Sequence, residues 1–151
     1  MSTDKPRVLV SAAEEADISR ALMIWINTFT DDEMLFVNYE FLAADSAGMA
    51  LSTIPGTYIT RRYILGGHEA EYQFKIIVRI IPGNGASNGK RLNADALLNR
   101  LGDWATTNYP DLGENIHVRR VEIASRAAMF AKYEDGTEDH QILMKLTYEV
   151  I

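Results

Sequence analysis

Apolar residues recur at two different periods along this chain, and each period predicts one kind of element. Between Asp17 and Thr30 they recur every three or four positions, at Ile18, Leu22, Trp25, Ile26 and Phe29. A second such stripe follows Asn93, at Ala94, Leu97, Leu98, Leu101, Trp104 and Ala105. This spacing places the apolar side chains on one face of a helix. Asn93 is a residue type that caps helices, and the residue before Pro110 disfavours the helical conformation. The sequence therefore predicts two amphipathic helices.

Alternation of apolar and polar residues predicts strands in much of the remaining chain. The dipeptides Gly66-Gly67 and Asp135-Gly136 each separate two such runs, so both predict hairpins. Residues 43–50 are mostly small and show no clear period, and Pro55-Gly56 interrupts the chain. We expect strands over residues 57–65, 70–81, 114–124, 127–133 and 139–151, and the run 36–42 is compatible with a further strand.

The order of these elements favours an α+β fold. It reads α, two or three β, α, three β, and strands joined by short turns favour antiparallel pairing with both helices on one face. We expect an antiparallel or mixed β-sheet with two main α-helices packed on one face. A length of 151 residues is close to the most common domain size, so a single domain over residues 1–151 is predicted. Residues 1–15 are assigned to an N-terminal arm whose flexibility the sequence leaves open.

Composition and charge narrow the function classes. The chain has no cysteine, which excludes disulfides, Cys-ligated zinc and thiol catalysis from its chemistry. Its net charge of −6 disfavours nucleic-acid binding, which depends on basic patches. Only three apolar residues, 8–10, follow the polar start of the chain, and no apolar run approaches the length of a membrane span. We expect no signal peptide and no membrane association.

The loop between the second predicted hairpin strand and the second helix carries two catalytic patterns. Residues 85–89 have the letters of the G-x-S-x-G nucleophile elbow, with Ser87 as its serine. The elbow needs a sharp turn directly after a strand, but Pro82-Gly83-Asn84 makes this loop slack. Asp111 and His140 would complete the chain order of a hydrolase triad, so a serine hydrolase using Ser87 stays open as an alternative function.

The end of the same loop, Gly89-Lys90, resembles the end of a phosphate-binding P-loop. That motif requires a glycine where Asn84 stands and a serine or threonine where Arg91 stands, so the pattern is incomplete. We interpret the stretch as a flexible polar loop. Residues 83–90 are expected to be mobile in the isolated subunit and ordered in an assembly.

Charged side chains are the better candidates for a functional surface. Arg61-Arg62 and Arg119-Arg120 lie within predicted strands, and they indicate either edge strands protected by charge or a subunit interface with ion pairs. The run 31–33 follows the first helix; adjacent acids rarely converge on one metal ion, and His68, His117 and His140 share no metal-ligand spacing. We expect no cofactor and no metal. The residues assigned to an interface are Arg61, Arg62, Arg119, Arg120, Asp31, Asp32, Glu33, Asn84, Ser87, Asn88 and Lys90.

An ordered series of short local features extends over residues 17–151 and resembles one protein family. Its members here are Trp25-Ile26-Asn27-Thr28, Ile54-Pro55-Gly56, Arg62-Tyr63-Ile64-Leu65-Gly66-Gly67, Tyr72-Gln73-Phe74 with Arg79, Leu101 with Trp104, Pro110-Asp111-Leu112-Gly113, Asp135-Gly136-Thr137, and Gln141-Ile142 leading to Leu146-Thr147-Tyr148-Glu149. The series resembles the small tailed-bacteriophage proteins called minor capsid proteins, found in phages and prophages of Gram-positive bacteria. That family is similar to the tail terminators, or tail completion proteins, of long-tailed phages.

The resemblance implies a structural role without catalytic residues. Tail terminators form hexameric rings that cap the tail tube, stop its growth and dock to the head. The implied partners are further copies of the chain, the major tail tube protein and a head connector or completion protein. The implied location is the virion, at the phage tail or head–tail junction, after assembly in the cytoplasm of the host bacterium. A head-completion or connector protein of the same phage module and a small monomeric binding domain of the host remain open as alternatives.

Overall fold

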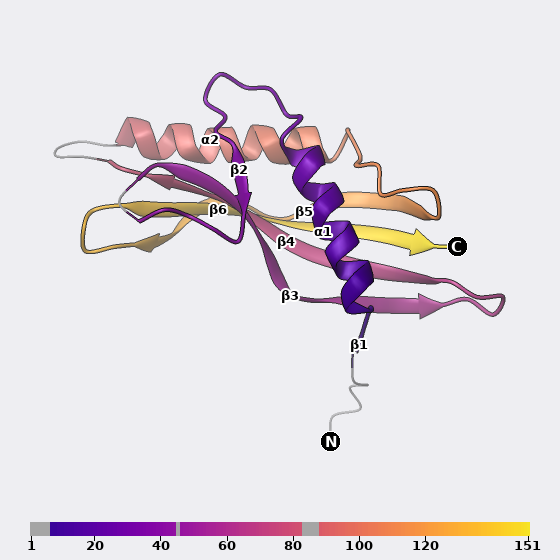
Figure 1. Ribbon diagram of the computed structural model, residues 1–151. Coiled ribbons are helices and arrows are strands. Elements are labelled where there is room, and N and C mark those ends of the chain that lie inside the picture. The colour runs from indigo at the N-terminus through magenta and orange to yellow at the C-terminus, as the bar shows by residue number, and fades with distance from the viewer. Residues whose placement is uncertain (1–6, 45, 83–87) are drawn as a thin grey trace.

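A computed structural model describes residues 7–44, 46–82 and 88–151 of the chain. Within these residues a six-stranded sheet and two helices form an α+β fold, which confirms the predicted fold class (Figure 1). The elements in chain order are β1 (Val8–Leu9), α1 (Ala12–Ile26), β2 (Val37–Tyr39), β3 (Gly48–Arg62), β4 (His68–Ile80), α2 (Asn88–Ala105), β5 (Ile116–Lys132) and β6 (Glu138–Val150). No helix in the described ranges has the length and apolar character needed to cross a membrane.

The sheet is mixed and has the strand order β1-β3-β4-β6-β5. The short strand β2 pairs in parallel with the start of β3, and β1 pairs with a later part of β3, so both lie along the same side of that strand. The other pairings are antiparallel. Strand β5 therefore forms the opposite edge. The hairpins predicted at Gly66-Gly67 and Asp135-Gly136 join β3 to β4 and β5 to β6, and all four glycine and turn positions lie between paired strands.

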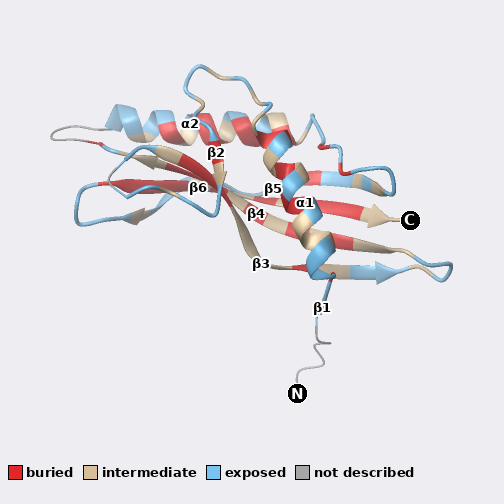
Figure 2. Ribbon diagram, viewed as in Figure 1, coloured by how far each residue is buried: buried red, intermediate tan, exposed pale blue. Residues whose placement is uncertain are grey.

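Both helices pack on one face of this sheet, as predicted. The side chains that alternate inward from β4 and β6 are buried beneath them, and Trp25 of α1 stacks on Trp104 of α2 with ring centroids 5.2 Å apart. Gly102 lets α2 approach β6 closely, because a Cβ atom there would lie 2.6 Å from Cδ1 of Ile142. Figure 2 shows the buried residues on the facing sides of helix and sheet. The inward residues of the two strands are Tyr72, Phe74, Ile76, Val78, Ile142, Met144, Leu146 and Tyr148.

Several predicted boundaries were wrong at the ends of helices. Helix α1 begins at Ala12 because the Ser11 side chain accepts a hydrogen bond from the Glu14 amide, so within the expected arm residues 8–9 lie in β1 and residues 12–15 lie in this helix. Helix α2 begins at Asn88, so Asn93 lies inside it and is not its N-cap. Its first turns are polar, which is why an apolar stripe could not reveal them.

Two predicted breaks between strands were also wrong. Strand β3 continues through Pro55-Gly56, where a register shift between Thr53 and Thr57 and a φ of 81° at Gly56 accommodate the interruption. The strands predicted over 114–124 and 127–133 form the single long strand β5, whose pairing with β6 shifts register at four places. Bulges in both strands keep one continuous strand where the sequence pattern shows an interruption.

Candidate interaction surface

A buried ion pair joins the end of β4 to the start of β6. The Asp139 carboxylate accepts hydrogen bonds from Nε and Nη2 of Arg79 at 2.7 and 2.8 Å and from the Tyr133 hydroxyl at 2.8 Å. The Arg79 guanidinium also lies over the Tyr133 ring, 5.0 Å from its centroid. The bond to Asp139 raises the pKa of Tyr133 above its ordinary value. Arg79, Tyr133 and Asp139 thus hold one another in place where they line a surface groove.

A second buried cluster lies between α2 and β6. The Glu138 carboxylate accepts Nε and Nη2 of Arg91 at 2.9 and 2.7 Å, and this pairing holds the pKa of Glu138 below its ordinary value. His140 lies between two carboxylates, with Nδ1 2.7 Å from Asp95 and Nε2 3.4 Å from Glu138. Both ring nitrogens of His140 thus face carboxylates, one from α2 and one from β6.

Asp111 is therefore not the acid partner of His140 that the hydrolase alternative requires. The Asp111 carboxylate accepts the Gly113 amide at 3.0 Å, and the partners of His140 are Asp95 and Glu138. Ser87 lies outside the described residues. The interpretation of residues 83–90 as a flexible loop is wrong for 88–90, which lie in α2, where Lys90 donates from Nζ to the Ile81 carbonyl at 3.0 Å; residues 83–87 lie outside the described residues.

A third polar cluster fixes α1 on the sheet. Oε2 of Glu14 accepts the Tyr148 hydroxyl at 2.7 Å and lies 2.9 Å from Nε2 of His68. Burial, followed by the bond to Glu14, raises the pKa of Tyr148 far above its ordinary value. The Tyr72 hydroxyl lies 2.8 Å from both the Ser19 and the Thr53 hydroxyls. These bonds explain why the polar first half of α1 stays in place.

The Arg91–Glu138 pair gives a testable pH dependence. Because the pKa of Glu138 is lowered by folding, its stabilising contribution is present above the unfolded pKa and is lost as the pH falls through the folded pKa. We expect Glu138→Gln to reduce the free energy of unfolding most near neutral pH and progressively less below about pH 5. Urea denaturation of wild type and variant over this pH range measures the difference.

Glu122→Gln is the matched control for this experiment. Glu122 pairs with Arg120 at 2.7 Å, but its side chain is 44% exposed. Exposed ion pairs contribute little to the free energy of unfolding. The difference in that free energy between this variant and wild type should therefore stay small at every pH. A Glu138→Gln difference that does not change with pH would contradict the assignment.

The predicted interface residues divide into engaged and exposed ones. Asp31 accepts Nε and Nη2 of Arg100 at 2.8 and 3.1 Å, which lowers the pKa of Asp31, so this residue joins the α1–β2 loop to α2. Asp32 and Glu33 are exposed. Asn88 and Lys90 are exposed in the first turn of α2, whereas Asn84 and Ser87 lie outside the described residues.

The two arginine pairs differ in their surroundings. Arg119 and Arg120 lie on the edge strand β5 and face Glu149 at 3.6 Å and Glu122 at 2.7 Å. Arg61 and Arg62 are exposed at the end of β3, and within the described residues the side chain of neither has a hydrogen-bond or ion-pair partner. Arg61 and Arg62 are therefore the pair available to another molecule.

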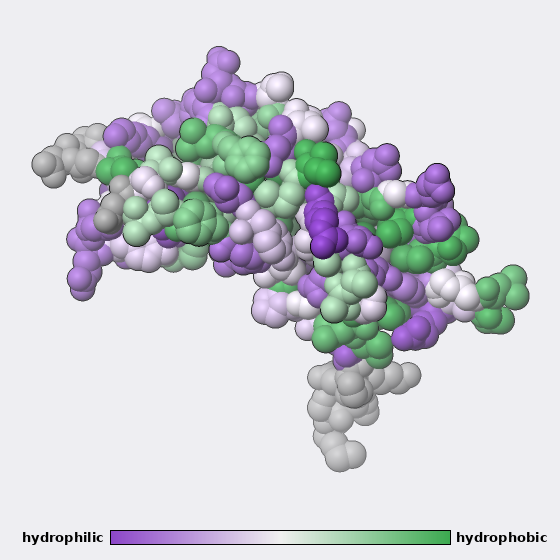
Figure 3. Space-filling view, in the orientation of Figure 1, coloured by the Kyte–Doolittle hydropathy of each residue, from purple (hydrophilic) through white to green (hydrophobic). Residues whose placement is uncertain are grey.

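Sequence reasoning missed the most exposed apolar feature, which lies beside this pair. Ile64 and Leu65, here called the apolar tip, end the β3–β4 hairpin with relative exposures of 102% and 100%. The hairpin is the green projection at the right of Figure 3. Its signal in the sequence was an Ile-Leu pair directly before Gly-Gly, where alternation had already stopped. A pattern search assigns such residues to a strand and not to a protruding turn.

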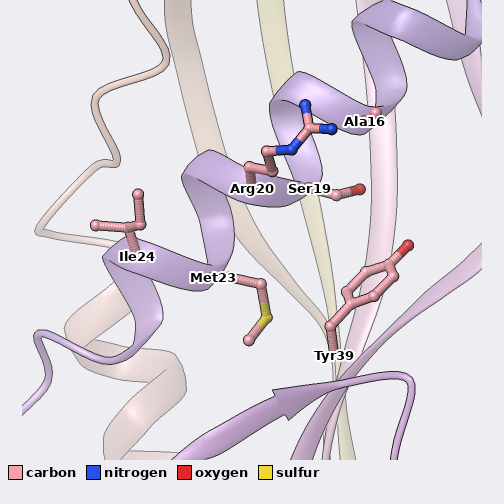
Figure 4. A pocket seen from close by; sticks show the side chains of 6 residues that line it. All are labelled: Ala16, Ser19, Arg20, Met23, Ile24 and Tyr39. Carbon is pink, nitrogen blue, oxygen red and sulfur yellow. The ribbon is translucent and has the colours of Figure 1, made fainter.

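Two of the surface grooves that border α1 have distinct linings. One lies between the outer side of the helix and β2 and has a mostly apolar lining of Ala16, Ser19, Arg20, Met23, Ile24 and Tyr39 (Figure 4). The other, here called the acidic groove, follows the end of the helix. Its lining combines four large apolar side chains with two aspartates: Asn27, Phe29, Thr30, Asp31, Asp32, Met34, Leu35 and Phe36. The acidic run predicted from the sequence thus borders an apolar surface.

Comparisons with known proteins give fold-level similarities alone. No protein-family model matches the sequence, and no curated protein does. Among solved structures, a chain of the virion of a native gene transfer agent particle superposes with a TM-score of 0.49 at 16% identity, over 93% of this chain and 87% of that chain. A second solved chain, whose name describes no function, gives 0.45 at 17% identity, over 94% and 96%. At these values neither similarity assigns a family or a function.

Proposed function

We propose that this protein is a structural component of a tailed-phage virion that assembles as a ring at the head–tail junction. In this role it is a tail terminator: it caps the tail tube, stops its polymerisation and presents a surface to the head. Its partners are further copies of itself, the tail tube protein and a head connector. The whole chain acts as one domain, and no catalytic residue takes part.

The observation that carries this proposal is the pair of different exposed surfaces on one chain. A cyclic assembly needs two distinct and complementary patches on each subunit. The apolar tip with Arg61 and Arg62 supplies one, and the acidic groove with Asp32 and Glu33 supplies the other. The ordered sequence features that resemble the phage family supply the biological setting.

Deleting the gene from a phage that encodes this protein tests the role directly. If the protein is a terminator, tube growth should continue in its absence and leave overlong, headless tails. A plasmid copy of the gene should restore normal tails. Electron microscopy of lysates measures both. Tails of normal length together with heads that have lost their DNA would indicate the connector role, and unchanged virions would refute both roles.

A further inference from the structure

The β3–β4 hairpin presents its apolar tip on a held turn. The Tyr63 amide donates to the Gly67 carbonyl and the Gly66 amide donates to the Tyr63 carbonyl, each at 3.2 Å. The Tyr63 hydroxyl donates to Glu149 at 2.9 Å, which fixes the base of the turn to β6. Because β4 begins to pair with β6 at His68 and Val150, residues 63–67 extend past the end of β6. Ile64 and Leu65 thus project into solvent from an ordered support.

The base of this hairpin carries two exposed arginines, Arg61 and Arg62. Both lie at the end of β3, where Arg61 pairs with Glu69 and Arg62 pairs with His68 across β3 and β4. Oε1 of Glu69 lies 3.2 Å from the Thr60 hydroxyl. His68, opposite Arg62, is bound to Glu14. Glu149, which accepts the Tyr63 hydroxyl and faces Arg119, also lies at this base, so the positive groups available to another molecule are the exposed guanidinium groups of Arg61 and Arg62.

The acidic groove has the complementary combination of properties. Its rim is apolar, with Phe36 68% exposed and Leu35 43% exposed. Arg100 compensates Asp31, but Asp32 and Glu33 add two further negative charges beside that rim. The groove has a volume of about 500 Å³, and it lies in the loop between α1 and β2, well away from the β3–β4 hairpin (Figure 1). A chain cannot fill its own groove with its own apolar tip.

We propose that the apolar tip of one subunit docks into the acidic groove of a second copy of this chain, with Arg61 and Arg62 facing Asp32 and Glu33. This contact rests on the proposed ring and specifies how its subunits join. It is heterologous, since different surfaces meet, and its repetition closes a ring or extends a filament. The apolar residues supply the buried centre, and the opposite charges select the partner and its orientation.

Charge reversal on each side and on both sides tests the contact in purified protein. We expect R61E/R62E and D32R/E33R each to raise the concentration for half-assembly at least about tenfold, because each places like charges across the contact. A chain carrying all four changes should return to within about threefold of wild type, since the pairing is restored with inverted signs. I64S/L65S should raise the half-assembly concentration by at least about thirtyfold. Sedimentation velocity at low salt measures each value.

R119E/R120E is the matched control, because it reverses the same number of charges on the β5 edge and should change assembly less than about threefold. Thermal unfolding of every variant checks that the changed residues, all exposed, leave folding intact. A wild-type protein that stays monomeric up to its solubility limit overturns the proposal. So does a variant with all four charge changes that folds but does not regain assembly. Binding to anionic phospholipid vesicles that requires Ile64 and Leu65 would assign the apolar tip to a membrane instead.

Failure of this contact and failure of the proposed function give different results. Overlong tails after gene deletion, combined with assembly that ignores the Arg61 and Arg62 changes, would keep the terminator role and reject this interface. Restored assembly in the variant with all four charge changes, combined with normal virions after gene deletion, would keep the interface and reject the terminator role.

Discussion

Asp139→Ala should lower the free energy of unfolding by about 3 kcal/mol, because it leaves a buried guanidinium without its carboxylate. The Asp139 side chain is 3% exposed and receives two bonds from Arg79 and one from Tyr133. The value is placed at the lower end of the range for broken buried pairs because Arg79 keeps 13% exposure and its contact with the Ala43 carbonyl. Urea denaturation monitored by tryptophan fluorescence measures the loss.

Asp103→Ala provides the contrast. Asp103 pairs with Arg126 at 2.9 Å, close to the 2.7 Å of the buried pair, but both side chains are more than half exposed. Its removal should cost less than about 1 kcal/mol. Replacing both buried partners, as Arg79→Met with Asp139→Leu, should recover much of the loss from Asp139→Ala, since no uncompensated charge remains. Equal losses of unfolding free energy for Asp139→Ala and Asp103→Ala would refute the stabilising role of the buried Arg79–Asp139 pair.

The sequence predicted the elements whose signals are local. The apolar stripes of α1 and α2 and the two hairpin dipeptides each lie within one short segment, so the period and the turn residues were sufficient. Helix α2 was predicted too short because its first residues have polar side chains. Arg91, in that part, is held by Glu138 from β6, 47 positions away in the chain. No local pattern contains that information.

The ion pairs at the sheet depended on strand register. Arg79 and Asp139 become neighbours because β4 and β6 pair antiparallel at these positions, which the order of strands in the sheet determines. Alternation indicates which face a residue occupies and not which residue lies opposite. The clusters around Asp139 and Glu138 were therefore not predictable, although each participating side chain was visible in the sequence.

The candidate interface was predicted in part for the same reason. The pairs Arg61-Arg62 and Arg119-Arg120 are equivalent in sequence, and the fold alone distinguishes them by supplying carboxylates to the second pair. Ile64 and Leu65 are apolar residues that a pattern assigns to a strand, whereas the turn that Gly66 and Gly67 permit places them in solvent. Exposure here follows from a backbone turn.

Gly67→Ala should lower the free energy of unfolding by about 3 kcal/mol, whereas Gly66→Ala should lower it by about 1 kcal/mol. Both residues have positive φ, 85° at Gly67 and 99° at Gly66, which L side chains rarely adopt. A Cβ atom at Gly67 would also meet the Val150 carbonyl oxygen of the backbone, while one at Gly66 would have no atom within 4 Å. Denaturation curves of the two variants under identical conditions separate the clash from the shared conformational cost.

The same pair of variants connects the turn to assembly. Val150 ends β6 and pairs with His68, so a displaced Gly67 moves the base of the hairpin that carries Ile64 and Leu65. Gly67→Ala should therefore weaken self-association at temperatures where the variant is still folded, and Gly66→Ala should weaken it less. A Gly66→Ala variant as unstable as Gly67→Ala would show that positive φ dominates and that the approach to Val150 is unimportant. A docked tip must keep its position to fill a groove on another subunit, which is why displacement of the hairpin should weaken assembly. If both variants assemble as well as wild type, the hairpin tolerates this displacement.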